Sequence, residues 1–326
     1  MTQALIVQLT EPGGPEAMHL VSVDVPAPGP GEVQLRQTAI GFNFIDVYQR
    51  SGRYILPNPS GLGHEAAGVV EALGAGVDDV KVGDRVAYMN AGLGAYAERR
   101  NVAAAKLAIL SPGMPDDAAA AIFFKAMTAQ YLVKKTYPVQ RGDVVLVHSA
   151  AGGVGQILSS WAKALGATVI GTVGSAPKVE VAQAAGCDFV IDYSKADWVE
   201  QVIAASGGKK ARVVYDAVGQ HSFMGSLDCA APFGYVVLYG AASGPVAPFD
   251  TDLLNKKGCL FLTRPSVFPH NADPQAFRAN AKDVFDAFER GLIRANIGAR
   301  YSLRDIAQAH TDAERRASTG SIVIVP

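Results

Sequence analysis

Short apolar runs separated by proline and glycine turns dominate roughly the first 125 residues. Runs of this length between turn residues are typical of β-strands. They are Ala4–Leu9, Glu32–Ile40, Ala66–Leu73 and Arg85–Tyr88. Little before Asp116 has helical periodicity, apart from the stretch around Phe44–Gly52. We therefore expect a β-rich N-terminal region.

Strands and helices alternate in the region that follows a predicted helix at Ala118–Lys135. The predicted strands are Asp143–His148, Thr168–Val173, Asp188–Asp192, Arg212–Asp216 and Tyr235–Tyr239. The predicted helices between them are Val154–Leu165, Lys178–Ala185, Trp198–Ala205 and Ser222–Ala230. Such alternation predicts right-handed βαβ units and a parallel sheet. The tail adds predicted helices at Pro274–Arg290 and Leu303–Ala317 and a strand at Ser321–Val325.

A glycine-rich turn joins the first strand of the alternating region to its helix. The segment Ala150–Gly155 reads A-A-G-G-V-G, a GxGxxG pattern in which Ala150 replaces the first glycine. Glycines at these positions allow a tight turn, a close approach of the backbone to a pyrophosphate, and packing of helix on strand. The helix N-terminal amides then face the phosphates. The alternative is a tight βα turn of any α/β fold, but the strand before it and the helix after it favour dinucleotide binding.

The end of the second strand indicates which dinucleotide is preferred. An NAD site usually has an Asp or Glu about 20 residues after the glycines, to bind the ribose 2′-hydroxyl. No carboxylate occurs from Ile170 to Lys178; Gly174 leaves room, Ser175 offers a hydroxyl and Lys178 a positive charge. Tyr193, just after the third strand, is placed to cover the same group. These residues favour NADPH, although Lys178 also fits an ordinary solvated helix lysine.

Composition and charge limit which binding partners and which cellular compartment are expected for this protein. The chain has 326 residues, 49% hydrophobic and 18% charged, so two globular domains are expected. With a net charge of −1 and no basic tract, nucleic acid is not an expected partner. Cys187, Cys229 and Cys259 form no CxxC pair, which favours a reducing compartment without disulfides. No signal peptide and no membrane span are recognised, so the protein is expected to be cytoplasmic.

Several motifs resemble those of the medium-chain dehydrogenase/reductase family, over essentially the whole chain. Gly63–Glu65 with Ala67–Val70 resembles the family's GHE…GxV segment, and Val82–Val86 resembles its GDRV turn. Three stretches are similar to the quinone oxidoreductase (zeta-crystallin-like) branch: Asn43–Tyr54, Ser149–Gly155 and Arg316–Ser321. The branch has alanine where Ser149 stands, a mild departure.

The resemblance implies a fold and a set of roles. The fold is a Rossmann doubly wound parallel sheet domain at 127–267, inserted in a β-rich GroES-like catalytic domain at 1–126 and 268–326. The active site would be the cleft between the domains, with Asn43 facing both nicotinamide and substrate. The other implied cofactor-binding residues are Thr128, Tyr131, Gly152, Gly153, Val154, Gly174, Ser175, Lys178, Tyr193, Val218, Gly240, Arg264 and Arg316.

The catalytic chemistry expected from this set needs no metal. Nicotinamide transfers the hydride, and the protein positions the reactants. Tyr48 and Tyr54 are candidate hydrogen-bond donors to a carbonyl oxygen, with ordinary packing as the alternative. Asn43 is a candidate orienting residue, with a helix-cap role as the alternative. His64 has no accompanying cysteine and is interpreted as a hydrogen-bonded loop residue.

Zinc enzymes of the family have a cysteine where Asn43 stands and a cysteine-rich lobe after the GDRV turn. Residues Tyr88–Tyr96 contain no cysteine and are too few for such a lobe. We therefore expect no metal site.

The expected activity is hydride transfer from NADPH to small quinones. Two alternatives stay open: an NADPH-dependent enoyl or alkenal reductase that uses a tyrosine such as Tyr48 as acid, and a non-catalytic NADPH-binding protein. The fold alone does not separate them. The resemblance also implies a homodimer, in which Gly258–Thr263 pairs as an edge strand with its symmetry mate; the alternative is an interior strand.

Overall fold

The computed structural model describes residues 2–315 and 320–326. Among them, two compact units are distinguished: one contains the described residues of Met1–Phe124 and Asn271–Pro326, and the other contains Lys125–His270. The sequence-based boundaries, after 126 and after 267, stay a prediction of how the domains divide. Within the described residues, no helix combines the length and apolar composition needed to cross a bilayer.

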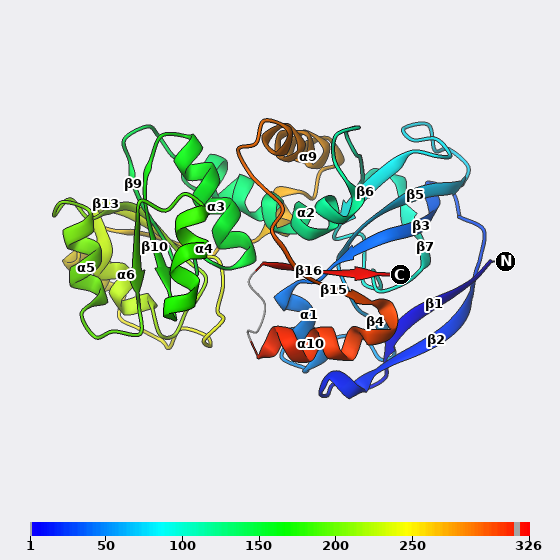
Figure 1. The fold of residues 1–326 in the computed structure, drawn as a ribbon, viewed down its shortest axis with the longest axis horizontal. Helices are drawn as coiled ribbons and strands as arrows, with labels where there is room; N and C mark the ends of the chain where they lie inside the picture. The colour runs from blue at the N-terminus through cyan, green and yellow to red at the C-terminus, as the bar shows by residue number, and fades with distance from the viewer. Residues whose placement is uncertain (1, 316–319) are drawn as a thin grey trace. The chain divides into compact units, whose positions relative to one another are not determined.

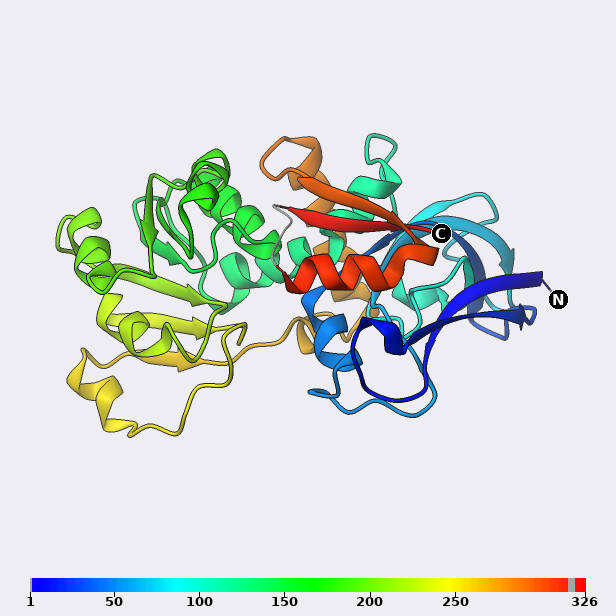
Figure 2. The same ribbon diagram turned by 60° about the horizontal axis from the view of Figure 1, so that its bottom comes forward.

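The first unit is built mainly from antiparallel strands, as the turn-rich N-terminal pattern predicts (Figure 2). Its strands are β1 (Thr2–Leu9), β2 (Met18–Val25), β3 (Glu32–Gly41), β4 (Ser60–Gly61), β5 (Glu65–Leu73), β6 (Arg85–Met89), β7 (Arg99–Ala103), β8 (Leu107–Ile109), β15 (Ile297–Ser302) and β16 (Ser321–Val325). One sheet has the order β2-β1-β4, and the other has the order β15-β16-β3-β5-β6-β8, with β7 also paired to β3. The C-terminal strand β16 thus joins the N-terminal strands, pairing antiparallel with β3.

Helices close the first unit around an aliphatic core. They are α1 (Phe44–Arg50), α9 (Pro274–Glu289), α10 (Ile306–Glu314), the 3-10 turns η1 (Pro15–Ala17), η2 (Ala104–Lys106) and η5 (Leu303–Asp305), and α2 (Asp116–Tyr131), which runs on into the second unit. Val33, Leu35 and Ile40 of β3 and Ile324 of β16 are fully buried in this core. Burial of such side chains is worth about 1.5–3 kcal/mol each. Strand β3 therefore anchors the segment that follows it, which is α1.

The second unit is a parallel sheet with helices on both faces (Figure 1). Its strand order is β11-β10-β9-β12-β13-β14, with β9 (Val144–Val147), β10 (Thr168–Val173), β11 (Phe189–Asp192), β12 (Ala211–Asp216), β13 (Ala230–Leu238) and β14 (Phe261–Thr263). Its helices are α3 (Gly153–Ala164), α4 (Val179–Ala184), α5 (Trp198–Ala205), α6 (Phe223–Cys229), α7 (Asp252–Lys256) and α8 (Val267–His270), with the turns η3 (Leu132–Thr136) and η4 (Ala176–Lys178). Every paired strand in this sheet is parallel, so the predicted doubly wound Rossmann sheet is confirmed.

Most predicted elements match the observed ones, and the differences lie at their ends. Gly166 and Gly186, with φ of +93° and +97°, follow the helices that end before them, as expected for glycine caps. The helix predicted at 118–135 ends at Tyr131 and continues as a π-turn, and only Phe261–Thr263 of the predicted 258–263 strand pairs. That short strand lies at the sheet edge, and its interior alternative is excluded.

Candidate active site

The glycine-rich turn follows β9 and leads directly into α3. Ser149 has φ +54°, so the chain turns sharply there, and Gly152 is the N-cap residue of α3. A Cβ atom at Gly155 would lie 2.1 Å from the carbonyl oxygen of Ser149, so only glycine fits. The first amides of α3 have no intrahelical acceptor. The amide of Gly152 donates to the carbonyl oxygen of Ser149 at 2.8 Å, whereas Gly153 and Val154 are the first two residues of α3. A helix N-terminus of this kind is suited to bind an anion such as a pyrophosphate.

The residues predicted to hold the 2′-phosphate lie together at the end of β10. Ser175 is the N-cap of η4, and Lys178 ends η4 just before α4. A Cβ atom at Gly174 would lie 2.8 Å from the hydroxyl of Tyr193, whose amide donates to the carbonyl oxygen of Val173 at 3.0 Å. The free space expected at Gly174 is therefore taken by Tyr193. The missing Cβ at Gly174 lets the tyrosine close over the strand end.

Sequence reasoning missed one carboxylate near this group. Asp192 ends β11 and lies in register with Val173 of β10, so the sheet brings it beside the strand end that is free of acids in the linear sequence. Its Oδ1 accepts from the amide of Ser194 at 3.0 Å, which lowers the pKa of Asp192 below its ordinary value. The Asp192 carboxylate is thus fixed by a hydrogen bond within the turn that follows β11.

Two further predicted cofactor residues are organised by Asp216, the last residue of β12. The amide of Val218 donates to Asp216 Oδ1 at 2.8 Å, and the amide of Gly240 donates to the Asp216 carbonyl oxygen at 3.2 Å. A Cβ atom at Gly240 would lie 2.5 Å from the carbonyl oxygen of Ala217. Glycine is therefore required for this close approach of two backbone segments.

Thr128, Tyr131 and Arg264 are the remaining predicted cofactor residues of the second unit. Thr128 and Tyr131 are buried on α2, and the Tyr131 ring stacks on His270 with centroids 4.4 Å apart. Burial raises the pKa of Tyr131 and the positive charge of Arg264 lowers it, so these two side chains interact. The net effect raises the pKa of Tyr131, so its phenol is uncharged at neutral pH.

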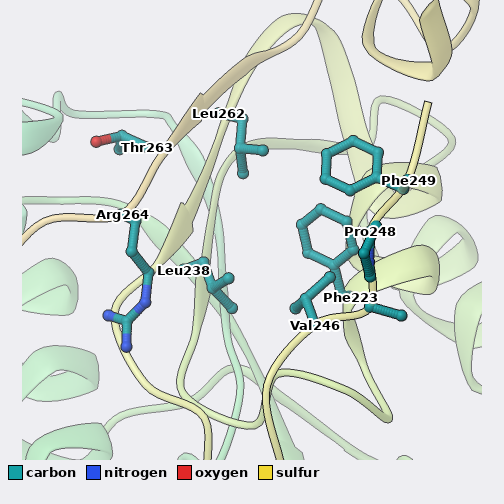
Figure 3. A pocket seen from close by; sticks show the side chains of 9 residues that line it. Phe223, Leu238, Val246, Pro248, Phe249, Leu262, Thr263 and Arg264 are labelled. Carbon is teal, nitrogen blue, oxygen red and sulfur yellow. The ribbon is translucent and has the colours of Figure 1, made fainter. Parts of the chain in front are cut away.

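Arg264 also borders a cavity of about 410 Å³ within the second unit. The cavity is lined by Phe223, Leu238, Val246, Ala247, Pro248, Phe249, Leu262, Thr263 and Arg264. Leu238 and Leu262 stand between Arg264 and the rings of Phe223 and Phe249 (Figure 3). The cavity is thus apolar except at its Thr263–Arg264 end.

Asn43, in the first unit, is the N-cap residue of α1 and is 6% exposed. Its backbone amide donates to Asp46 Oδ2 at 2.9 Å, and its side-chain Nδ2 donates to Glu65 Oε1 at 2.7 Å. The other Glu65 oxygen accepts from the amide of Phe124 at 2.6 Å. Asn43 therefore is the helix cap that the alternative interpretation describes, and Glu65 orients its amide group. The sequence did not single out Glu65 for this role.

Tyr48 and Tyr54 belong to an aromatic row on the surface of the first unit. The rings of Phe44, Tyr48 and Tyr54 pack edge to face, with centroid distances of 5.5 and 5.7 Å. Arg53 places its guanidinium carbon 4.5 Å from the Tyr48 ring centroid. Tyr54 is 43% exposed and Tyr48 is half-buried. The row presents two phenol groups and one cation, which suit a planar acceptor with carbonyl oxygens.

His64 is hydrogen-bonded, as the sequence predicts. Its Nε2 lies 3.0 Å from Gln49 Oε1, and burial, together with the charge of Arg100, lowers the pKa of His64 to about 4. Across the described ranges 2–315 and 320–326, no cluster of three or more His, Cys, Asp or Glu has the geometry to hold a metal ion. The cysteines Cys187, Cys229 and Cys259 are free thiols. Arg316, the last predicted cofactor contact, lies outside the described residues.

Known proteins resemble this chain along its whole length. The family model "Alcohol dehydrogenase GroES-like domain" matches residues 29–116, and "Zinc-binding dehydrogenase" matches residues 153–270. A quinone oxidoreductase of Pseudomonas aeruginosa is 45% identical, over 98% of this chain and 99% of its own. A 2-haloacrylate reductase of a Burkholderia species is 41% identical, over 96% of both chains.

A solved structure also resembles this chain along nearly its whole length. The crystal structure of the Escherichia coli quinone oxidoreductase in complex with NADPH is 42% identical, covers 99% of this chain and 100% of its own, and superposes with a TM-score of 0.96. This chain therefore belongs to the medium-chain dehydrogenase/reductase family and, within it, to the branch of the quinone oxidoreductases.

Proposed function

We propose that this chain is an NADPH-dependent quinone oxidoreductase that reduces small quinones by hydride transfer. The observation that carries the proposal is the pair of strand ends in the second unit. The Ser149–Gly155 turn fits a pyrophosphate, and Gly174, Ser175, Lys178 and Tyr193 gather where an adenosine 2′-phosphate is bound in such folds. The NADPH complex of the 42% identical E. coli enzyme supports the same cofactor.

Different residues of the chain would bind different parts of NADPH. Gly153 and Val154 would hold the pyrophosphate through backbone amides, and Gly152, whose own amide donates to Ser149, would let the backbone come close to it. Lys178 with Ser175 would hold the 2′-phosphate. The remaining cofactor contacts proposed are Asn43, Thr128, Tyr131, Gly174, Tyr193, Val218, Gly240, Arg264 and Arg316. Bound NADPH supplies the hydride.

The acceptor would bind against the aromatic row. Tyr48 or Tyr54 would donate a hydrogen bond to a quinone oxygen, so that the oxygen gains negative charge in a stabilised position as the hydride arrives. A proton then completes the hydroquinone. Asn43, fixed by Glu65, would orient the reactants; it is 6% exposed and cannot swing freely.

Steady-state oxidation of NADPH against 1,4-benzoquinone, a conjugated enone and acetaldehyde tests this function. We expect the quinone to react fastest and acetaldehyde to be nearly inert, because the proposed mechanism uses no metal to polarise the carbonyl oxygen of acetaldehyde. Failure of every quinone to accelerate NADPH oxidation would reject the proposal, and NADPH binding without turnover would favour the non-catalytic alternative.

A second candidate function, reduction of a conjugated carbon–carbon double bond, is favoured by the 41% identity to a 2-haloacrylate reductase. In that reaction the hydride is added to one alkene carbon and a phenol such as that of Tyr48 protonates the other. The two functions therefore differ in how strongly they need the acid. An enone or haloacrylate that outruns every quinone would establish the second function.

We also propose that the enzyme works without zinc, as a homodimer, in the cytoplasm. The acceptor-side residues of the first unit include no thiol, and three free cysteines fit a reducing compartment. Elemental analysis of protein purified without chelators should show far less than one zinc per chain, whereas stoichiometric zinc would contradict the metal-free mechanism. Cell fractionation tests the compartment.

A further inference from the structure

A chain of buried polar side chains runs beneath the carboxyl ends of three neighbouring strands. Thr172 belongs to β10, His148 follows β9, and Asp216 ends β12. His148 Nδ1 lies 2.8 Å from Thr172 Oγ1, and His148 Nε2 lies 3.0 Å from Ser226 Oγ of α6. Ser226 Oγ donates in turn to Asp216 Oδ2 at 2.8 Å. All four residues are fully buried.

This hydrogen-bonded row of side chains crosses the point at which the strand order reverses. From β9, the succession of strands first goes outward through β10 and β11, and then returns to β12 on the other side of β9. Ligands of such sheets bind in the crevice outside the carboxyl ends of these two central strands. The link from His148 through Ser226 to Asp216 spans β9 and β12 just below this crevice. Trp198 of α5 packs edge-on against His148, so the link lies on the face covered by α5 and α6.

Asp216 connects this link to the backbone that surrounds the crevice. Its carboxylate accepts from the amides of Val218 and Gly219 at 2.8 and 3.0 Å and from the hydroxyl of Ser222 at 2.7 Å. Its carbonyl oxygen accepts from the amides that follow β13, including that of Gly240. One side chain and its backbone thus hold both segments that carry Val218 and Gly240.

The hydrogen-bond directions determine the form of the histidine. The Ser226 hydroxyl has one proton, which it donates to Asp216, so His148 Nε2 must carry a proton and donate to Ser226. Thr172 then donates to His148 Nδ1. Burial lowers the pKa of His148, while the charge of Asp216 raises it. The ring is therefore neutral, with its proton on Nε2.

We propose that Asp216, acting through Ser226 and His148, is the positioning residue that fixes the segments that follow β9 and β12, where the two strands stop pairing, in the arrangement that a dinucleotide requires. Neither Asp216 nor His148 touches the ligand in this role. The inference rests on the proposed NADPH site, because it assigns the network to that crevice. Breaking the network should weaken NADPH binding more than it slows turnover of bound substrate.

The first test compares two buried serines of the second unit. Ser226→Ala removes the link, whereas Ser159→Ala removes an equally buried hydroxyl of α3 that accepts only from the thiol of Cys187 at 3.4 Å. Losing one hydrogen bond to a charged group should raise the Kd for NADPH about tenfold in Ser226→Ala, with kcat at saturating NADPH changed less than about threefold. Ser159→Ala should keep the wild-type Kd.

Equal Kd values for wild type and Ser226→Ala, both folded by circular dichroism, would overturn the proposal. So would a tenfold loss in Ser159→Ala, because any buried serine would then serve equally. If the wild-type protein binds no NADPH, the proposed function fails, and the network is then judged by the second test alone.

The second test measures the tautomer of His148 by nitrogen-15 NMR, with assignment from a His148→Gln variant. Wild type should show a neutral ring protonated on Nε2 at pH 7. Asp216→Asn turns one carboxylate oxygen into a donor, so the Ser226 hydroxyl must donate to His148 instead and the ring proton moves to Nδ1. A wild-type ring protonated on Nδ1, or charged at pH 7, would overturn the network; an unshifted tautomer in folded Asp216→Asn would do the same.

Discussion

The contact between Gly174 and Tyr193 predicts how cofactor preference responds to a single added methyl group. A Cβ atom at position 174 would lie 2.8 Å from the Tyr193 hydroxyl oxygen. Ordinary contact begins near 3.4 Å, so Gly174→Ala must displace that hydroxyl by about 0.6 Å. If the Tyr193 hydroxyl binds the 2′-phosphate, as proposed, the displacement should cost about 0.5–1.5 kcal/mol, or roughly 2–13-fold in the Kd for NADPH. NADH lacks the phosphate and should be unaffected.

Replacing Gly174 by aspartate adds a charge effect to this displacement. Gly174 is exposed, so the dielectric constant of water applies, and two unit charges about 4 Å apart repel by roughly 1 kcal/mol. A phosphate of nearly two charges doubles this, and about 2 kcal/mol corresponds to roughly 30-fold. Gly174→Asp should therefore bind NADPH about 30-fold more weakly than Gly174→Ala. The preference should turn toward NADH.

Fluorescence titration of both cofactors measures these effects, and Tyr193→Phe supplies the control. In the Tyr193→Phe background the hydroxyl is already absent, so Gly174→Ala should cause little further loss of NADPH binding, and the double-mutant cycle should be clearly non-additive. Equal weakening of NADH and NADPH by Gly174→Asp would refute the placement of the phosphate. Additive single effects would refute the part given to Tyr193.

Three other predictions follow from the same structure. Tyr48→Phe should slow quinone reduction only about tenfold but an enone reductase roughly 10²–10⁴-fold; near-complete loss with quinones would show that Tyr48 is an essential acid. Phe261, on edge strand β14 and 52% exposed, should lie at the dimer contact. Light scattering should therefore show a dimer for wild type and a monomer for Phe261→Lys, and a monomeric wild type would reject the contact. Burial lowers the pKa of His64 to about 4 and that of His310 to about 3 in the folded protein, whereas a histidine of the unfolded chain has a pKa of about 6.5. Below pH 6.5 the unfolded chain therefore binds more protons than the folded protein does. The free energy of unfolding should be undiminished above pH 6.5 and fall as the pH drops toward 4; urea unfolding that is constant from pH 6.5 to 5 would contradict this.

Much of the fold could be predicted because its signals are local in the sequence. The strand at Thr168–Val173 and the helix after the glycine turn follow from apolar runs and from the residues that bound them. Gly155, Gly166 and Gly186 stand where a tight turn or a left-handed cap excludes other residues, whatever packs around them. The positions at which the backbone turns sharply or a helix ends were therefore readable from the linear order.

The partners of those segments were decided only by the tertiary structure. Glu65 is 22 positions from Asn43, and Ser226 is 78 positions from His148, so no periodicity connects them. Tyr193 fills the space at Gly174, and Asp192 approaches a strand end that is free of acids in the sequence, because β10 and β11 pair in register. Sheet order and register bring together residues that are distant along the chain, whereas turns and caps depend on neighbours a few residues away. The sequence alone thus determined where the backbone turns, and the packed sheet determined which side chains meet there.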